Sequence, residues 1–315
     1  MKRMISNDVR LWINCVLLAT GSVLLFYGGP HHYSPRIFIH LWDTGHIIYF
    51  ALLASLLSRW RFVGRRSLAG QWTIILGITL LAGVSIELLQ HGTGRIPDTG
   101  DVLRDVTGSL VVLAFGSPGL ASQPPGWRRF LKVAVLVFLL VQLWPLTRAL
   151  VDEAIAWQQF PMLSSFETPF ELGRWEGNAG LTVEPVPSVS PGKLLKLSLT
   201  TAPYSGAMLR HFAGDWTAAD TLNISIYNPG DAPLQITCRI HDLQHADGNQ
   251  DYEDRFNKSF LLRRGWNHIA IDLGEAEESP ADRSMDMSRI RGLGIFVMSL
   301  PEPGFLYLDN VRLSP

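Results

Sequence analysis

The spacing of apolar residues divides the chain into two halves. Up to about residue 150, apolar residues form long runs separated by short Arg-rich or Gly/Pro-rich links, and from about residue 164 polar and apolar residues alternate. Long apolar runs are typical of membrane-spanning helices, and a period of two is typical of strands with one buried face. The pattern predicts an α-helical membrane bundle over 1–150, a linker over 151–163 with a candidate helix at 152–159, and an all-β jelly-roll sandwich over 164–315.

Five apolar runs in the first half predict five transmembrane helices. The runs cover 11–27, 37–57, 72–89, 102–115 and 130–146. The fourth run is short compared with the roughly 20 residues that a membrane span needs. We therefore expect its polar first turn to lie at the membrane interface or inside the bundle.

Basic residues orient the predicted spans. Lys and Arg are concentrated in the first ten residues, at 59–66 and at 128–132, which fall on one side if the spans alternate. The positive-inside rule then places the N-terminus in the cytoplasm and the second half outside a bacterial inner (cytoplasmic) membrane. The net charge of −1 indicates no nucleic-acid partner. Cys15 and Cys238 lie in different halves, so no disulfide is expected.

Polar residues gather at the outer ends of the second, third and fourth predicted spans. They are Asp43, His46, Glu87, Gln90, Arg95, Asp98, Asp101 and Asp105. Many are three or four positions apart, so each such pair shares a helix face. Ionisable side chains in a membrane usually face the bundle interior, a partner or a watery cavity. The pattern predicts a polar site in the outer leaflet for a lipid or a lipid-linked headgroup.

Two roles for this cluster follow from the residue types alone. The first is a buried ion-pair network in which Arg95 lies between Asp98 and Asp101 and fixes the helix packing. The second is a divalent metal site, although no HExxH-type motif is present. The metal ligands would be His46, Glu87, His91 and one aspartate.

A third role is acid/base catalysis. A histidine and several carboxylates in a partly desolvated pocket have pKa values that are driven apart, which provides one proton donor and one acceptor. His46 would move the proton, Glu87 or Asp101 would act as the base, and Arg95 would hold a phosphate or carboxylate. The candidate catalytic residues are Asp43, His46, Glu87 and Asp101.

The spacing of these residues resembles the VanZ-like membrane protein family over about 35–118. The shared elements are Asp43-x-x-His46-x-x-Tyr49, Glu87-x-x-Gln90, Arg95-x-x-Asp98-x-x-Asp101 and Gly108. The resemblance implies a small integral membrane bundle linked to glycopeptide resistance, and thus to the cell envelope, with no assigned reaction. The chain departs from the family pattern at Thr44, Asp105 and Val112.

The second half contains eight stretches with the composition of short strands. They cover 194–200, 208–212, 222–227, 234–240, 259–262, 268–273, 294–298 and 305–313. Turn-forming clusters such as Asn228-Pro229-Gly230-Asp231 separate them. Many short strands without helical periodicity predict a sandwich or a jelly roll.

Several motifs in this half resemble galactose-binding-like jelly-roll domains, including family 11-type carbohydrate-binding modules, over about 164–315. The motifs are Phe166-Glu167, Trp175, Asp242, the segment LLRRGWNHIAIDL at 261–273 and LYLDNVRL at 306–313. The resemblance implies glycan binding and a structural Ca²⁺ where the first and last strands meet. Glu167 and Asp309 are the residues here that fit such a site, since Ca²⁺ prefers oxygen ligands.

Sugars bind to flat aromatic faces and planar hydrogen-bonding groups. The residues in or beside loops that could supply them are Tyr204, Trp216, His241, Asp242, Tyr252 and Arg255. Trp175 and Trp266 adjoin apolar strand positions and are expected in the core. No adjacent nucleophile and base are evident in this half.

The sequence favours an integral membrane protein of the cell envelope, or one associated with exopolysaccharide. Its helices would hold a polar site for a lipid or lipid-linked glycan, and its external domain would bind polysaccharide or cap the bundle. One alternative is a membrane enzyme that modifies an envelope glycolipid by acid/base chemistry. Another is a structural membrane anchor for an interaction domain.

Overall fold

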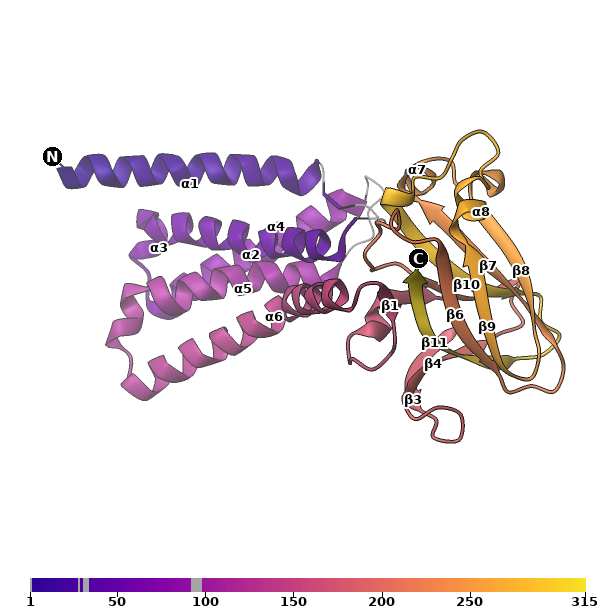
Figure 1. Cartoon of the computed structure of the whole chain (residues 1–315). Helices are drawn as coiled ribbons and strands as arrows, with labels where there is room; N and C mark the ends of the chain where they lie inside the picture. Colours follow the sequence, from indigo (N-terminus) through magenta and orange to yellow (C-terminus); the bar gives the residue numbers. More distant parts are fainter. Residues whose placement is uncertain (1, 28, 31–33, 92–97) are drawn as a thin grey trace. The chain divides into compact units, whose positions relative to one another are not determined.

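The computed structural model describes residues 2–27, 29–30, 34–91 and 98–315. The chain forms two compact units, Met1–Ala149 and Leu150–Pro315. The first unit is helical, and the second is mainly two antiparallel sheets (Figure 1). The predicted order of a helical region followed by a β-sandwich is therefore confirmed.

The helical region consists of α1 (Lys2–Phe26), α2 (Arg36–Arg59), α3 (Arg61–Gly64), α4 (Leu68–His91), α5 (Thr99–Gly116), η1 (Pro118–Ser122) and α6 (Pro125–Gln159) (Figure 1). Among the described residues, α2, α4 and α6 are long and apolar enough to cross a membrane. The apolar part of α1, Leu11–Phe26, is shorter, and the 18 residues of α5 include three charged side chains. The prediction of five spans is thus supported for three helices.

Gly108 brings α5 into backbone contact with α2. A Cβ atom at this position would lie 2.2 Å from the Ile47 carbonyl oxygen and 2.9 Å from the Ala51 amide nitrogen. A hydrogen bond of 2.7 Å between the Thr79 and Ser109 hydroxyls joins α4 to α5. Small residues at such contacts let helix backbones approach closely inside a membrane. An apolar cluster completes the packing through Ala54, Val63, Ile75 and Leu113.

The last part of α6 occupies most of the predicted linker. Residues 151–159 are helical as expected for 152–159, but they continue α6 without a break. No Gly or Pro occurs between Leu146 and Gln159, so nothing in the sequence ends the helix earlier. Asp152 is buried and forms an ion pair of 2.8 Å with Arg174. The end of α6 therefore belongs to the fold of the second unit.

The sandwich contains eleven strands in its described residues. They are β1 (Met162–Ser164), β2 (Trp175–Gly177), β3 (Gly180–Pro185), β4 (Lys193–Leu199), β5 (Tyr204–Leu209), β6 (Thr221–Asn228), β7 (Leu234–Asp242), β8 (Phe256–Leu262), β9 (Gly265–Asp272), β10 (Ile290–Met298) and β11 (Gly304–Ser314). One sheet has the order β3-β4-β11-β6-β9, with β1 also paired to β11, and the other has the order β2-β5-β10-β7-β8 (Figure 1). Short helical turns connect them: η2 (Glu171–Arg174), α7 (Leu243–Asp247), η3 (Tyr252–Asp254), α8 (Leu273–Glu277) and η4 (Met287–Arg289).

Alternation along β7 shows how the sandwich core forms. Ile236, Cys238 and Ile240 are completely buried in the apolar core. Residues at alternate positions of a strand point to opposite faces, so Thr237 and Arg239 point outward. Burial raises the pKa of the Cys238 thiol to about 12. Cys238 and Cys15 are both free.

Candidate functional site

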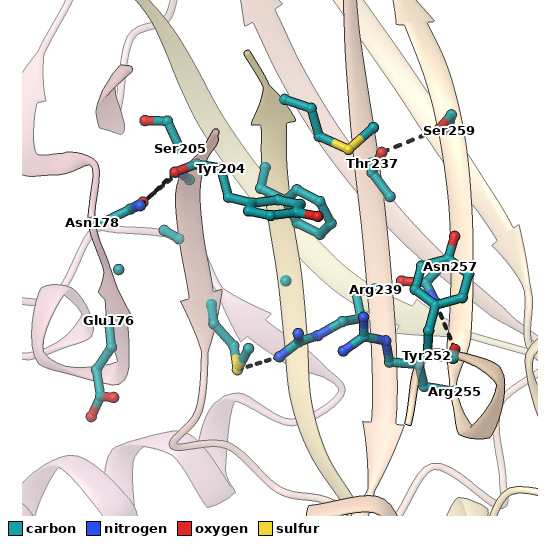
Figure 2. A pocket seen from close by; sticks show the side chains of 17 residues that line it. Glu176, Asn178, Tyr204, Ser205, Thr237, Arg239, Tyr252, Arg255, Asn257 and Ser259 are labelled. Atoms are coloured by element: carbon teal, nitrogen blue, oxygen red, sulfur yellow. Dashed lines mark hydrogen bonds between the residues drawn. The ribbon is translucent and has the colours of Figure 1, made fainter. Parts of the chain in front are cut away.

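The outward face of the five-stranded sheet forms a cavity of about 530 Å³ (Figure 2). Gly294 on β10 lies in its centre, paired with Met208 on β5 and with Arg239 on β7. Arg239 in turn pairs with Asn257 on β8. Because Gly294 has no side chain, the Arg239 side chain can lie over it, and its Nη2 atom reaches the Met208 sulfur at 3.8 Å (Figure 2).

Two exposed tyrosines line the cavity. The side chains of Tyr204 and Tyr252 are 61% and 63% exposed. The ring of Phe296 packs edge-on against Tyr204 at a centroid distance of 6.0 Å. Asn178 holds the backbone of β5 because its side-chain amide donates to the Tyr204 carbonyl oxygen at 2.5 Å and accepts from the Gly206 amide at 3.0 Å (Figure 2). The cavity therefore combines fixed backbone with accessible aromatic rings.

The polar groups of the cavity are mainly planar. Figure 2 shows the guanidinium groups of Arg239 and Arg255 at the same end of the cavity, close to Tyr252. The Arg255 guanidinium carbon lies 5.3 Å from the centroid of the Tyr252 ring. The Asn257 side chain donates to the Tyr252 carbonyl oxygen at 3.4 Å. Guanidinium and amide groups present donors in fixed directions, which suits recognition of ligand oxygens.

An ion-pair network fixes the loop that carries Tyr252 and Arg255. Arg283 donates to Asp254 at 2.5 Å and to both carboxylate oxygens of Asp242, at 2.5 and 2.9 Å. Burial alone would raise the pKa of Asp242, but hydrogen bonds from Arg283 and from the amides of His245 and Asp286 lower it. Asp242 is completely buried, so its predicted role as a ligand-binding residue is wrong. It instead positions this loop.

Trp216 is the second predicted ligand-binding residue that the structure does not support. Its side chain is completely buried, its ring packs against Phe212, and its indole nitrogen donates to the Ala213 carbonyl oxygen at 3.1 Å. Its backbone amide also bonds to the Met287 carbonyl oxygen. An indole enclosed in this way cannot stack on a sugar, so Trp216 belongs to the core.

Tyr204, Tyr252 and Arg255 line the cavity, as the sequence suggested they could. Sequence reasoning missed Arg239 and Asn257, which lie opposite each other in the sheet. The alternation in β7 contained a signal for Arg239, because an arginine between two core positions must point to the outer face. The partner strand could not be deduced in the same way, since register is a property of the folded sheet.

The two carboxylates expected to bind calcium each accept a hydrogen bond from a backbone amide. Glu167 accepts from the Lys193 amide at 3.0 Å, and Asp309 accepts from the Asn310 amide at 2.8 Å. Glu171 lies nearby, and burial together with the charges of Glu167 and Glu171 raises the pKa of Asp309. Within the described ranges, no group of three or more His, Cys, Asp or Glu residues could hold a metal ion. Calcium binding stays a prediction without an assembled ligand set.

The polar cluster of the helical unit is centred on His46. Its Nδ1 atom lies 2.9 Å from Asp105 Oδ1, and its Nε2 atom lies 3.6 Å from Asp101 Oδ2. His46 and Asp105 are buried, whereas the Asp101 side chain is 17% exposed. Helices α2 and α5 thus place a histidine between two carboxylates, which is a geometry suited to proton transfer.

Among the described residues, Arg104 is the arginine that contacts this cluster. Arg104 forms ion pairs with Asp98, Asp101 and Asp43, and the Asp98 and Asp43 contacts measure 3.2 and 3.6 Å. Arg95 lies outside the described residues. Asp101 and Arg104 are three positions apart on α5, so they share one helix face. Arg104 lies within the predicted fourth span, 102–115, and was not among the predicted site residues.

Helix α4 contributes a buried carboxylate, Glu87, and a buried side-chain amide, Gln90. Glu87 Oε2 accepts from the Asp98 amide at 2.8 Å, while Glu87 Oε1 and Asp105 Oδ2 are buried and accept no hydrogen bond from the described residues. Gln90, predicted to bind ligand, is buried and donates to the Leu25 carbonyl oxygen at 2.7 Å, so it packs α4 against α1. The exposed His91 shares no metal-binding group with His46 in the part of the chain that the structure describes.

Comparisons with known proteins name no family for this chain. No family model and no curated protein matches it. Solved structures similar to its second unit include an exo-β-agarase (20% identity, TM-score 0.40, covering 49% of this chain and 24% of the agarase). Another is a family 11 carbohydrate-binding module from Clostridium thermocellum in complex with a β-1,3-1,4-mixed-linked tetrasaccharide (19% identity, TM-score 0.38, covering 49% of this chain and 94% of the module). A third is the CBM28 module specific for non-crystalline cellulose (14% identity, TM-score 0.34, covering 50% of this chain and 93% of the module). The VanZ-like resemblance of the helical region stays a prediction.

Proposed function

We propose that this is a membrane-anchored glycan-binding protein whose outer domain holds a glycan in the cavity of the five-stranded sheet. The observation that carries the proposal is the cavity itself, in which exposed Tyr204 and Tyr252 accompany Arg239, Arg255 and Asn257. Ligand sites typically combine such an apolar and aromatic lining with a few convergent polar groups. The apolar helices would anchor the domain, and the loop charges would place it outside the cytoplasm.

The cavity can hold a sugar chain by two kinds of contact. The apolar faces of sugar rings would stack on Tyr204 and Tyr252, which bury large areas with few rotatable bonds. Hydroxyl groups would accept hydrogen bonds from Arg239, Arg255 and Asn257.

Removing the exposed rings should weaken glycan binding. Tyr204→Ala and Tyr252→Ala should each raise the dissociation constant of a bound glycan about tenfold, because each loses one stacking surface. A glycan array with the full-length chain in detergent micelles would identify ligands, and calorimetry would measure the affinities.

Phe305→Ala is the matched control, because Phe305 is a partly exposed aromatic on β11 in the other sheet. Unchanged affinity in both tyrosine variants would show that the glycan binds elsewhere. If no glycan binds at all, the proposal fails, and an anchor for an interaction domain becomes the better interpretation.

A second candidate function is acid/base chemistry at the polar cluster, as in the predicted membrane enzyme. His46 lies between Asp101 and Asp105, and it also borders an apolar groove of about 350 Å³ lined by α1 and α2. Such a groove suits a lipid chain whose headgroup reaches His46. Carboxylates outnumber guanidinium groups among the described cluster residues, so the cluster favours a headgroup that offers hydroxyl groups over one that offers only phosphate.

Variants of the cluster should change membrane lipids if this chemistry occurs. His46→Gln and Asp101→Asn should lower the amount of a modified lipid about 100-fold, a typical contribution of a general acid or base. Mass spectra of lipid extracts from the native host would compare each variant with wild type and with a gene deletion. Ser85→Ala is the control, because Ser85 is exposed on α4 and its hydroxyl donates to the Leu81 carbonyl oxygen one turn earlier in the same helix. Identical lipids in the deletion and in wild type would refute an enzymatic role.

A further inference from the structure

A second pocket of the sandwich lies on the outward face of the six-stranded sheet, opposite the face that forms the glycan cavity. It has a volume of about 190 Å³ and is lined by residues of β6, β9 and β11, which are neighbours in that sheet (Figure 1). Its polar lining residues are Asn223, Ser225, His268, Asn310 and Arg312. The described lining residues of the two pockets do not overlap, so this pocket is a separate surface of the domain.

A β-bulge turns two residues of β11 toward this pocket. The register of β11 against β6 shifts between Asp309 and Arg312, where β11 contains one extra residue. Residues three positions apart on a regular strand point to opposite faces, so without the bulge Arg312 would point into the core. Asn310 lies within the bulge at φ 51°, a conformation that asparagine adopts more readily than most residues. Bulges often re-aim side chains beside functional sites, and this one brings an amide and a guanidinium group to one face.

Arg312 is the charged residue of this pocket. In the described part of the chain, no carboxylate lines the pocket and Arg312 forms no ion pair. Asp309 precedes the bulge, but its carboxylate accepts from the Asn310 amide at 2.8 Å. Burial together with the charges of Glu167 and Glu171 raises the pKa of Asp309, which reduces the tendency of this group to carry negative charge. The local charge of the pocket is therefore positive.

The neutral side chains of the pocket are held in place by hydrogen bonds. The Asn223 amide donates to the Ser314 hydroxyl at 2.9 Å. The Ser225 hydroxyl lies 3.1 Å from Nδ1 of His268, and Ser225 is buried whereas His268 is exposed. An imidazole that accepts from a hydroxyl at Nδ1 carries its proton on Nε2, and this N–H group can donate to a ligand. Guanidinium, imidazole and amide donors thus surround one small space.

We propose that this pocket binds a small oxyanion group, such as sulfate, phosphate or carboxylate, with Arg312 as the main contact. A guanidinium group donates two parallel hydrogen bonds to such an anion, and charge-assisted bonds are about twice as strong as neutral ones. Asn310 and His268 would donate to the remaining oxygens. The volume is below that of typical sites for larger ligands, so it suits a single anionic group. The inference goes beyond the proposed glycan-binding function and does not depend on it.

Titration with simple anions tests the proposal. The full-length chain in detergent micelles would be titrated with sodium sulfate, phosphate and acetate in a calorimeter, with NaCl keeping the ionic strength constant. We expect saturable binding of at least one anion in the millimolar range. Glucose 6-phosphate compared with inorganic phosphate distinguishes two sources of the group. Tighter binding of the ester would indicate an anionic group carried by a larger ligand, and tighter binding of inorganic phosphate would indicate the free ion.

Variants of β11 connect the binding to this pocket. Arg312→Gln should weaken anion binding about tenfold or more, because the charge-assisted hydrogen bonds are lost. Arg312→Lys should recover only part of the affinity, since lysine keeps the charge but lacks the planar fork. Asn310→Gly removes the amide while it permits the positive φ of the bulge, and it should weaken binding several-fold. Arg264→Gln is the control, because Arg264 is 68% exposed and pairs with Asp231 at 2.5 Å outside the pocket.

The outcomes decide this inference separately from the proposed function. The absence of saturable binding for all three anions would overturn it. Binding that survives both Arg312→Gln and Asn310→Gly unchanged would also overturn it, because the anion would then bind elsewhere on the chain. Glycan affinity at the other sheet is measured with Tyr204→Ala and Tyr252→Ala, and Arg312→Gln should leave that affinity unchanged.

Discussion

Replacing Arg174 with methionine is expected to lower the free energy of unfolding of the sandwich by about 3–5 kcal/mol. Arg174 is completely buried, and its Nε and Nη2 atoms donate to Asp152 Oδ1 at 2.9 and 2.8 Å. Its Nη1 atom donates to the Leu163 carbonyl oxygen at 3.1 Å. The substitution would remove the guanidinium group that binds the buried Asp152 carboxylate, and breaking a buried ion pair by removing one partner is strongly destabilising.

Thermal unfolding of the full-length chain in detergent, followed by tryptophan fluorescence, would measure this loss. Arg264→Met is the matched control, and we expect an effect below about 0.5 kcal/mol because its ion pair is exposed. Adding Asp152→Leu to Arg174→Met should recover part of the stability, since apolar side chains then replace both members of the buried pair. Equal stability of Arg174→Met and Arg264→Met would contradict the importance of the buried pair.

Replacing Gly108 with alanine is expected to destabilise the helical unit by about 1–3 kcal/mol. The new Cβ atom would overlap the Ile47 carbonyl oxygen, so α2 and α5 would have to move apart. Gly108 follows Asp105 by three positions, and Ile47 follows His46 directly. Separation of the helices would therefore also lengthen the 2.9 Å contact between His46 and Asp105.

Gly77→Ala provides the comparison for this prediction. Gly77 is also inside a helix, and beyond the local helix backbone no atom lies within 4 Å of the place that a Cβ atom would take. Alanine there should be neutral or stabilising by up to about 1 kcal/mol. Detergent-solubilised protein would be heated, and the fraction that remains unaggregated would be measured for both variants. A Gly108→Ala protein as stable as Gly77→Ala would mean that α2 and α5 tolerate a wider spacing.

Strand positions were predictable wherever apolar residues alternate strictly. The predicted stretches at 222–227 and 234–240 coincide with β6 and β7, because their inward positions are apolar at every second residue. In contrast, β5 begins at Tyr204, earlier than the predicted 208–212, since Ser205 and Gly206 interrupt the alternation. The short strands β1 and β2 were missed because three residues cannot show a period.

The functional residues were harder to predict than the strands, because their roles depend on partners far along the chain. Trp216 has polar neighbours and looked exposed, yet the Met287 carbonyl oxygen binds its backbone amide. Asp242 looked like a loop acid, but Arg283 approaches it from 41 positions away. Helical spacing did place Asp101 and Asp105 on one face of α5, whereas the contact of Arg104 with Asp43 on α2 required the fold.

The buried thiol of Cys238 allows separation of the two sheets to be measured by alkylation. A thiol with a pKa near 12 and no access to solvent reacts very slowly with alkylating reagents while the two sheets stay together. Alkylation at this position therefore counts the molecules whose strands have separated, without an added dye or an engineered label. Cys15 lies in the other unit, so a protease digest before mass spectrometry assigns each modified sulfur to its own half of the chain.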